Sequence, residues 1–419
     1  MVEKLVYIQN FILFKWLSKT CVLLALVSGC ICISCIEEIT IENNNLESLL
    51  VVDATLTNQE IQQEIQLSRT FRFGENSNKP EENAQVKVIG NGVEYNFEEV
   101  APGRYQTPFV CSAQPNVSYQ LEIITSNGTK YTSTPKTLTS VTQIDALYAN
   151  RIVNDNGIDG VAILVDSFDP TNSSNYYRYS FEETYKIIAP LWVAEDLFVI
   201  SNLYPDCEVG FQQRTEAQRI CYSTESSNAI NITNTIALTE DKVQGHMVHF
   251  LSNQDFKISH RYSTLVHQFV ISEETHQYLK TIQSFTSQGS LFSQLQAGFV
   301  AGNVSSLENE NEKVVGFFEV SSVSSRRVFF NYNDLYPNTS LPPFTIICDE
   351  NAPSLFGPFG SNRCGGLVFA VENRTRVYLE DYTGEPELFG DPGPYLLVPR
   401  ACGDCTALGE SEPPSFWID

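Results

Sequence analysis

Basic residues are scarce in this chain of 419 amino acids. Lys and Arg together number 26 against 50 Asp and Glu, so the formal net charge is −24 at pH 7. Residues 1–34 hold three Lys and one Glu, so without them the chain would be more acidic still. A surface this acidic repels nucleic acid and bare anionic membranes. We therefore expect no nucleic-acid partner and interpret the charge mainly as a source of solubility.

Sequence motifs of common catalytic sites are missing as well. The chain contains no GxSxG nucleophile motif, no HExxH metal motif and no Gly-Lys-Ser/Thr phosphate loop. With 50 acidic residues, pairs of carboxylates are expected by chance, and no glycosidase-like pair can be chosen among them. The sequence thus predicts no catalytic residue and no cofactor. A hydrolase that uses an unrecognised pair of acids on a glycan or peptide stays open as an alternative.

The spacing of candidate metal ligands is also poor. All five histidines lie between His246 and His276. His246 and His249 are three residues apart, which on a regular strand places their side chains on opposite faces. Asp155–Gly160 (DNGIDG) resembles a calcium loop, but Gly157 stands where Asp or Asn is required, so we predict a turn there. No metal site is expected.

The apolar stretch near the N-terminus is short. Val22–Gly29 cannot span a bilayer, which takes about 20 helical residues. Lys4, Lys15 and Lys19 precede the stretch, and positive charge before a short apolar segment is typical of a cleaved export signal. We therefore predict a signal rather than a membrane-spanning helix.

A lipid-attachment pattern follows this stretch. A lipoprotein signal places an aliphatic residue three positions before the lipidated cysteine and small residues just before it. Val27–Cys30 (VSGC) fits this pattern, and Cys32–Cys35 (CISC) fits it less well. Glu37 and Glu38 favour the second site, because acids just behind the lipidated cysteine resemble an export signal of surface lipoproteins.

We therefore predict lipidation at Cys35, with Cys30 as the alternative. An ordinary secretory signal with incidental cysteines is the competing interpretation. Multiple acylation of one cysteine gives a stable anchor, since each buried CH₂ contributes about 0.8 kcal/mol. On this interpretation residues 1–35 are signal and anchor, and residues 36–45 are a polar tether.

Cysteines are frequent in the rest of the chain. Seven lie beyond the anchor: Cys111, Cys207, Cys221, Cys348, Cys364, Cys402 and Cys405. In an oxidising compartment several of them should form disulfides. We expect Cys207 and Cys221 to close a loop and Cys111 to be the unpaired one. The last four cysteines allow three pairings, or a zinc site, although only Cys402–Cys405 has CxxC spacing.

The pattern of side chains beyond the tether predicts a mainly β protein. In residues 46–138, short runs alternate apolar and polar side chains, as in Val117–Ile123. Asn91–Gly92 separates two such runs and is a strong signal for a hairpin. We predict a β-sandwich of the immunoglobulin or fibronectin type for this part.

Residues 139–419 predict a larger β-rich domain with one notable helix. That helix begins after Ser272, which can cap it, and ends by Gly289. The tail of the domain is rich in Pro, Gly and Asn and is expected to be held together by disulfides. Two short strands are predicted in this tail, at Leu367–Val371 and Val377–Leu379.

Several short segments, in order, resemble the bacterial lipoprotein family known as domain of unknown function 4249. The segments are Cys35–Glu38, Leu50–Asp53, Thr55–Thr57, Pro102–Tyr105, Tyr176–Arg178, Gly289–Phe292, Gly302–Val304, Val315–Phe318, Ser325–Phe329, Cys402–Cys405 and Phe416–Trp417. The resemblance implies Gram-negative export, lipidation and display at the cell surface. It also implies an association with TonB-dependent outer-membrane receptors, but no established activity.

The sequence and the resemblance together predict a lipid-anchored outer-membrane protein, exposed on the cell surface of a Gram-negative bacterium. It is expected to act without catalysis, as a binding accessory of a TonB-dependent uptake receptor. The alternatives are the extracellular hydrolase named above and a structural or adhesive surface protein.

Overall fold

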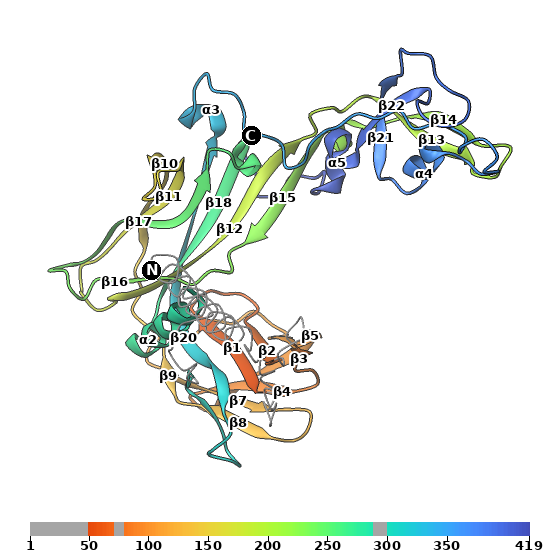
Figure 1. Ribbon diagram of the computed structural model, residues 1–419. Coiled ribbons are helices and arrows are strands. Elements are labelled where there is room, and N and C mark those ends of the chain that lie inside the picture. The colour runs from red at the N-terminus through yellow and green to blue at the C-terminus, as the bar shows by residue number, and fades with distance from the viewer. Residues whose placement is uncertain (1–48, 71–78, 288–299) are drawn as a thin grey trace, which may run out of the picture. The chain divides into compact units, whose positions relative to one another are not determined.

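Strands dominate the fold. The computed structural model describes residues 49–70, 79–287 and 300–419, and Figure 1 shows them as a succession of sheets. Within these three ranges the one long helix is α2 (Glu273–Ser287). The predicted fold class, a sandwich followed by a larger β-rich part with one notable helix, is confirmed. The predicted signal, anchor and tether lie outside the described residues.

The N-terminal sandwich forms one continuous path of hydrogen-bonded strands in the order β20-β1-β2-β6-β5-β4-β7-β8-β19. Its strands are β1 (Leu50–Thr57), β2 (Glu64–Arg69), β4 (Gln85–Gly90), β5 (Val93–Ala101), β6 (Arg104–Gln106), β7 (Ser118–Ile124), β8 (Lys130–Ser133), β19 (Val304–Ser306) and the first part of β20 (Val314–Asn331), with β3 (Lys79–Pro80) and β9 (Lys136–Thr137) at its edges. The predicted hairpin turn joins β4 to β5. There Asn91 and Gly92 have φ values of 49° and 78°, the left-handed conformation that such a turn needs.

Alternate side chains of these strands fill one core. Leu50, Val52, Ala54 and Leu56 of β1 are each at most 3% exposed, whereas the residues between them face outward or are half-buried. Late residues join this core as well: Val304, Val314, Phe318 and Val320. The sandwich therefore includes strands from outside residues 46–138.

Strand β20 connects the sandwich to the second part of the chain. Its residues 314–321 pair in parallel with β1, and its residues 322–331 pair antiparallel with β18 (Arg261–Val270). The buried Asn303 side chain binds the first half of β20: it donates to the Phe318 carbonyl at 2.8 Å and accepts from the Phe318 amide at 2.7 Å. One strand thus belongs to both hydrogen-bonded systems.

The second part packs a small sheet on a larger one. The larger sheet continues from β18 to β12 (Tyr176–Ile188), which also pairs with β15 (Ile220–Ser226) and β16 (Asn231–Asn234). The smaller sheet contains β10 (Ile144–Val153), β11 (Asp159–Asp169) and β17 (Asp241–Ser252). Tyrosines of β12 and valines of β11 meet in the core between them.

Helix α2 begins where the sequence predicts. The Ser272 hydroxyl accepts a hydrogen bond from the Thr275 amide at 3.1 Å, as an N-cap does, and Glu273 and Glu274 stand at the positive end of the helix. The apolar face of α2 turns toward β1 and β20, and the ring of Tyr278 lies 5.4 Å from the ring of Phe317.

The tail forms a lobe with an early hairpin. The hairpin is β13 (Glu195–Ser201) with β14 (Glu208–Gln213), and the tail supplies α4 (Gly366–Glu372), β21 (Arg376–Asp381), β22 (Tyr395–Pro399) and α5 (Arg400–Gly403). The short helix α3 (Tyr332–Leu335) directly follows β20 and packs on the core of the second part instead. Short 3-10 turns lie at Glu216–Gln218, Phe256–Ile258 and Cys405–Ala407. The strand predicted at Val377–Leu379 is confirmed within β21. The strand predicted at Leu367–Val371 is wrong, because Leu367, Ala370 and Val371 have helical spacing and pack together as one face of α4.

Three disulfides hold this lobe. They join Cys207 to Cys364, Cys221 to Cys405 and Cys348 to Cys402, while Cys111 is free. The expected Cys207–Cys221 loop is wrong, because the hairpin packs against the tail and brings together cysteines 157 and 184 residues apart. The four late cysteines do not pair only among themselves, and their sulfurs are not grouped as a zinc site would require.

We predict that the Gly316→Ala substitution lowers the stability of the protein more than Gly128→Ala does. Both glycines have positive φ, 127° and 89°, but only at Gly316 would a new Cβ meet an obstacle, lying 1.9 Å from the Val52 carbonyl oxygen. The free energy of unfolding should fall by roughly 3 kcal/mol or more for Gly316→Ala and by about 1 kcal/mol for Gly128→Ala. Urea unfolding of both variants measures this, and equal losses would contradict the close β1–β20 approach.

Candidate functional site

A cavity of about 430 Å³ lies beside helix α2, on the outer face of the sandwich. Its walls come from five segments of the chain: β1, the first half of β20, the start of β12, the loop of residues 227–230 and α2. The sequence folds this way because β1 and β20 turn one set of side chains into the core and the alternate set outward. Asp53, Phe317 and Glu319 belong to the outward set and line the cavity.

The cavity has one apolar wall and one charged wall. Tyr278, Leu279 and Ile282 of α2 form the apolar wall, together with Phe317. The charged wall contains Arg178 of β12 together with Asp53 and Glu319. The Arg178 guanidinium carbon lies 4.0 Å from the centre of the Phe269 ring, a cation–π contact between cross-strand neighbours.

Arg178 has no hydrogen bond and no ion pair with any residue that the structure describes. Burial lowers the pKa of this guanidinium, while the negative charges of Asp53 and Glu319 act in the opposite direction. No functional role was predicted for Arg178 from the sequence. A single basic residue inside the aromatic strand Tyr176–Phe181 was the only signal that could have marked it.

Glu319 is the second unusual charge of the cavity. It is 4% exposed, and its described hydrogen bond is from the Ser272 hydroxyl, which donates at 3.1 Å. Burial raises the pKa of Glu319 to about 7, although Ser272, Lys136 and Arg178 favour its charged form. The same hydroxyl caps α2, so this carboxyl group is tied to the helix start.

Three segments on which the family resemblance was based meet at this cavity. Leu50–Asp53, Tyr176–Arg178 and Val315–Phe318 each contribute lining residues. They are far apart in the chain, and strand β20 brings them together by pairing with β1 and β18.

His246 and His249 of β17 lie outside this cavity and pack against rings of β12. His246 stacks on Tyr179 with ring centres 4.8 Å apart, and His249 packs on Phe181 at 4.3 Å. Since Tyr179 and Phe181 share one face of β12, the expectation of opposite faces is wrong. A bulge in β17 at Val248 turns His246 and His249 to the same side.

These two rings pack against aromatic side chains of β12. Among the residues that the structure describes, no three His, Cys, Asp or Glu side chains gather as metal ligands would. Burial lowers the pKa of His246, whose Nε2 lies 2.8 Å from Asn231 Oδ1. Both observations fit a neutral, hydrogen-bonded ring.

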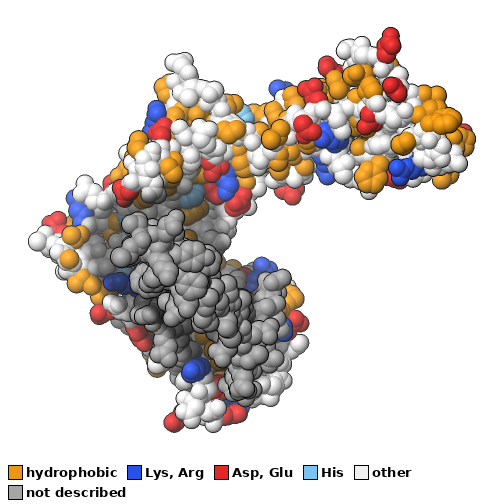
Figure 2. All heavy atoms as spheres, in the orientation of Figure 1, with side chains coloured by type: hydrophobic (Ala, Val, Ile, Leu, Met, Phe, Trp, Pro, Cys, Tyr) orange, Lys and Arg blue, Asp and Glu red, His pale blue; other side chains and the backbone are white. Residues whose placement is uncertain are grey.

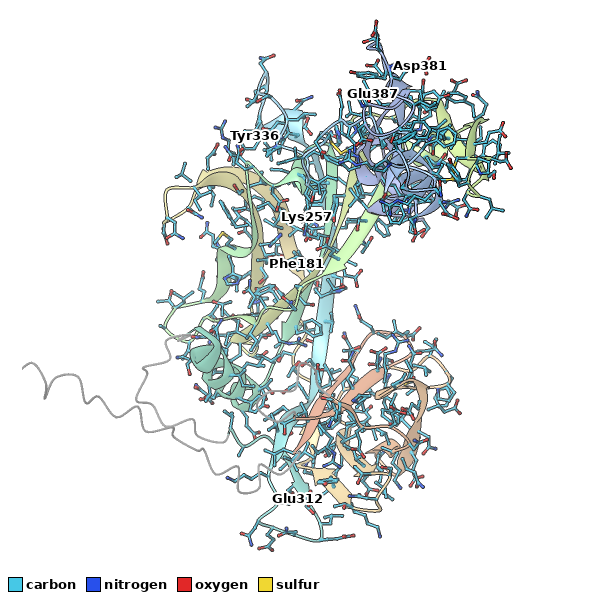
Figure 3. All side chains as sticks on the ribbon, turned by 45° about the vertical axis from the view of Figure 1, so that its right-hand side comes forward. Phe181, Lys257, Glu312, Tyr336, Asp381 and Glu387 are labelled. Atoms are coloured by element: carbon cyan, nitrogen blue, oxygen red, sulfur yellow. A yellow bond between two sulfur atoms is a disulfide. The ribbon has the colours of Figure 1, made fainter. Side chains whose placement is uncertain are left out.

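One pair of carboxylates shares a lysine. Lys257 donates to Glu183 at 2.7 Å and to Glu225 at 2.8 Å, and the Tyr262 and Tyr185 hydroxyls donate to the same two acids at 2.6 Å each. Figure 3 marks Lys257 near Phe181 in this region. Burial alone would raise the pKa of Glu183, but hydrogen bonds from His249, Lys257 and Tyr262 lower it to about 2.

This pair does not suit glycoside hydrolysis. That reaction needs one carboxyl group held protonated near neutral pH. The pKa of Glu225 is lowered too, chiefly by Lys257, so both acids are ionised. The hydroxyls of Tyr185 and Tyr262 also donate to these two acids, so the network joins β12 to β15 and β18.

The predicted turn at Asp155–Gly160 is confirmed and joins β10 to β11. The Asn154 side chain accepts hydrogen bonds from the Asn156 and Ile158 amides, both at 3.0 Å. Arg151 binds Asp159 through two hydrogen bonds of 2.9 Å. Asp159 is therefore occupied by an arginine rather than arranged for calcium.

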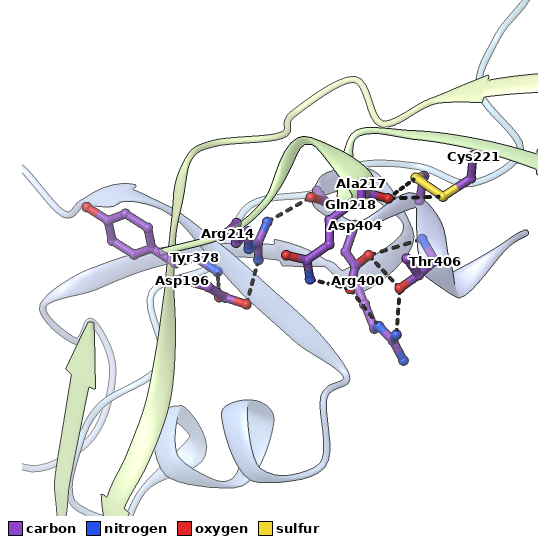
Figure 4. A network of polar contacts seen from close by, with 11 residues as sticks. Asp196, Arg214, Ala217, Gln218, Cys221, Tyr378, Arg400, Asp404 and Thr406 are labelled. Atoms are coloured by element: carbon purple, nitrogen blue, oxygen red, sulfur yellow. Dashed lines mark hydrogen bonds and ion pairs between the residues drawn. A yellow bond between two sulfur atoms is a disulfide. The ribbon is translucent and has the colours of Figure 1, made fainter. Parts of the chain in front are cut away.

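Figure 4 shows the polar contacts that join the hairpin to the tail. Arg214 binds Asp196 at 2.7 Å and donates to the Gly403 carbonyl at 2.7 Å. Arg400 donates to Asp404 at 3.2 Å. A cavity of about 280 Å³ adjoins them, but these charges already have partners, so we regard the network as a structural joint.

Aromatic side chains gather on the lobe, with Tyr204 and Phe359 exposed and Phe356 and Phe389 half-buried. The rings of Tyr204, Phe356, Phe389 and Phe359 form a chain with centre distances of 6.4, 5.9 and 5.4 Å. Phe359 is 87% exposed and the neighbouring Leu203 is 73% exposed. Figure 2 shows hydrophobic side chains on this part of the surface. We call these five residues the aromatic patch.

The predicted lipid sites, Cys35 and Cys30, lie outside the described residues. Within residues 49–70, 79–287 and 300–419, no helix is both long enough and apolar enough to cross a bilayer.

We predict that Glu319→Gln stabilises the protein at pH 8 and has little effect at pH 5. The pKa of Glu319 lies above its unfolded value of 4.5, so its stabilising proton is lost as the pH rises through about 7. The variant should gain up to about 3 kcal/mol at pH 8. Thermal unfolding at both pH values measures the difference, with exposed Glu60→Gln as control. A gain independent of pH would contradict the buried carboxyl group described above.

Comparison with known proteins places the chain in a family. The family described as Domain of unknown function (DUF4249) matches residues 36–327. That match extends from the predicted tether to the second half of β20, and it includes every element that lines the cavity beside α2. No curated protein matches the chain. The match covers more than half of the sequence, and this protein therefore belongs to the DUF4249 family.

Proposed function

We propose that this protein is exported, anchored to the outer membrane of a Gram-negative bacterium through lipid on Cys35 or Cys30, and displayed at the cell surface. On this proposal it acts by binding, as an accessory of a TonB-dependent uptake receptor. Export and lipidation are supported by the signal pattern and by the acids at Glu37 and Glu38.

The cavity beside α2 is the observation that carries the proposal of binding. It combines an apolar wall with Arg178, a charged group without a described partner, and Glu319, a buried carboxyl group. Pockets of this composition are typical of ligand sites, where few polar groups fix a ligand against apolar walls. One close pair of acids, Glu183 with Glu225, is bridged by Lys257.

Three disulfides support the proposed location. Disulfides persist in exported proteins and are rare in the reducing cytosol. Here they close loops with sequence separations of 157, 184 and 54 residues, and each joins parts of the lobe or its attachment to β15. Reduction would therefore release the part of the protein that has the smallest apolar core.

The aromatic patch supports a protein partner. Contiguous exposed apolar side chains are uncommon on monomeric soluble proteins and often mark interaction surfaces. Its rings are held by the Cys207–Cys364 disulfide, since Tyr204 and Phe359 lie within three and five residues of those cysteines. A fixed aromatic surface loses little side-chain entropy on binding.

Pull-down from solubilised outer membranes tests the proposed partner. The wild-type protein should recover a TonB-dependent receptor, and Phe359→Asp with Leu203→Asp should reduce the recovery severalfold because charge at the patch opposes burial. Added protease should also cut the protein on intact cells. Failure to recover a receptor, together with resistance to surface protease, would overturn the proposal and favour a structural role.

The two candidate anchors provide a matched pair of controls. Cys35→Ala should release the protein from the membrane fraction, whereas Cys30→Ala should leave it anchored. The reverse result would move the anchor to Cys30 and make Ile31–Glu38 part of the tether. Mass spectrometry of the mature N-terminus identifies the acylated residue directly.

A further inference from the structure

The cavity beside α2 contains an arrangement of charges that folding alone does not explain. Arg178 is half-buried, and a guanidinium that is partly removed from water is normally paired with a carboxylate, because its lost hydration is otherwise uncompensated. Arg178 lines the cavity and has no hydrogen bond or ion pair within the described chain. The nearest carboxylates, Asp53 and Glu319, act on it only through space.

We propose that Arg178 binds the carboxylate of a ligand that carries one negative charge beside an apolar group. This inference rests on the proposed binding function and names the class of ligand. A guanidinium presents several N–H donors in one plane, which match the two oxygens of a carboxylate. The Phe269 ring packs against this guanidinium, with its centre 4.0 Å from the guanidinium carbon.

The surrounding charges restrict the ligand to a single negative charge. Asp53 and Glu319 both face the cavity, and a dianion such as a phosphate monoester would meet repulsion from each of them. Arg178 supplies one positive charge, which can offset one carboxylate of the ligand, whereas a second negative charge on the ligand would add to those already in the cavity. The protein's net charge of −24 disfavours polyanions further.

The opposite wall selects the rest of the ligand. Tyr278, Leu279 and Ile282 of α2 present apolar and aromatic surface, and Phe317 completes that surface from β20. Burial of an apolar group there contributes about 25 cal/mol per Å² removed from water. A short aromatic or aliphatic carboxylate fits both walls within a volume of about 430 Å³.

Calorimetric titration of the full-length protein in lipid nanodiscs tests this assignment, with empty nanodiscs as the blank. The probes are 4-phenylbutyrate, its neutral amide 4-phenylbutyramide, and the dianion phenyl phosphate. Phenylbutyrate should bind saturably, and the other two should bind at least about tenfold more weakly, as expected for loss of a charge-assisted hydrogen bond.

Three variants test which residues are responsible for phenylbutyrate binding. Arg178→Met should weaken phenylbutyrate binding at least about tenfold and leave the amide unchanged, without lowering the melting temperature, because it removes an unpaired charge. Asp53→Asn should strengthen binding of phenylbutyrate, since it removes a repelling charge from an exposed position. Arg104→Met is the control, because Arg104 is half exposed on the sandwich and pairs with Glu64 at 3.7 Å.

Equal binding of phenylbutyrate to Arg178→Met and wild type would overturn the assignment of Arg178. Absence of saturable binding to the wild type would overturn the ligand class. Neither result predicts the outcome of the receptor pull-down, because that experiment tests the aromatic patch. Failure of this inference can therefore be distinguished from failure of the proposed function.

Discussion

The structure depends on the backbone hydrogen bonds of strand β20. Residues 314–321 continue the sandwich through β1, and residues 322–331 continue the second sheet through β18. Because one strand serves both, the outward side chains of the sandwich and the start of β12 occupy fixed positions beside each other. The cavity walls follow from this pairing, with Asp53 on one side and Arg178 on the other. Gly316 permits the close approach that the parallel pairing requires.

The buried charges of the molecule fall into two kinds. Glu183 is surrounded by Lys257, Tyr262 and His249, and its lowered pKa reports that the charged form is stabilised. Glu319 and Arg178 show the reverse, since burial disfavours the charged form of each. A charge that is buried without compensation destabilises the folded state. Such groups are concentrated at functional sites, which is why the cavity beside α2, and not the Glu183 network, supports a function.

The sequence predicted local structure well and tertiary pairing poorly. The Asn91–Gly92 turn and the cap at Ser272 depend on neighbouring residues, and both were found where predicted. The disulfide partners of Cys207 and Cys221 depend on contacts across more than 150 residues, which no local pattern encodes. The predicted orientation of His246 and His249 was wrong as well, because the bulge at Val248 belongs to the pairing of β17 with β11 and not to a local pattern. Arg178 was not identified from the sequence, because its lack of hydrogen bonds and ion pairs within the described residues is visible only in the structure.

Hydrogen exchange measured by mass spectrometry on the full-length protein tests the shared strand most directly. If β20 couples the two systems, amides in residues 314–321 and 322–331 should exchange slowly and with similar free energies of opening, together with those of β1 and β18. Rapid exchange of residues 314–321 while residues 322–331 stay protected would contradict the account. The sandwich would then open independently, and the cavity would lose the wall that holds Asp53 and Glu319.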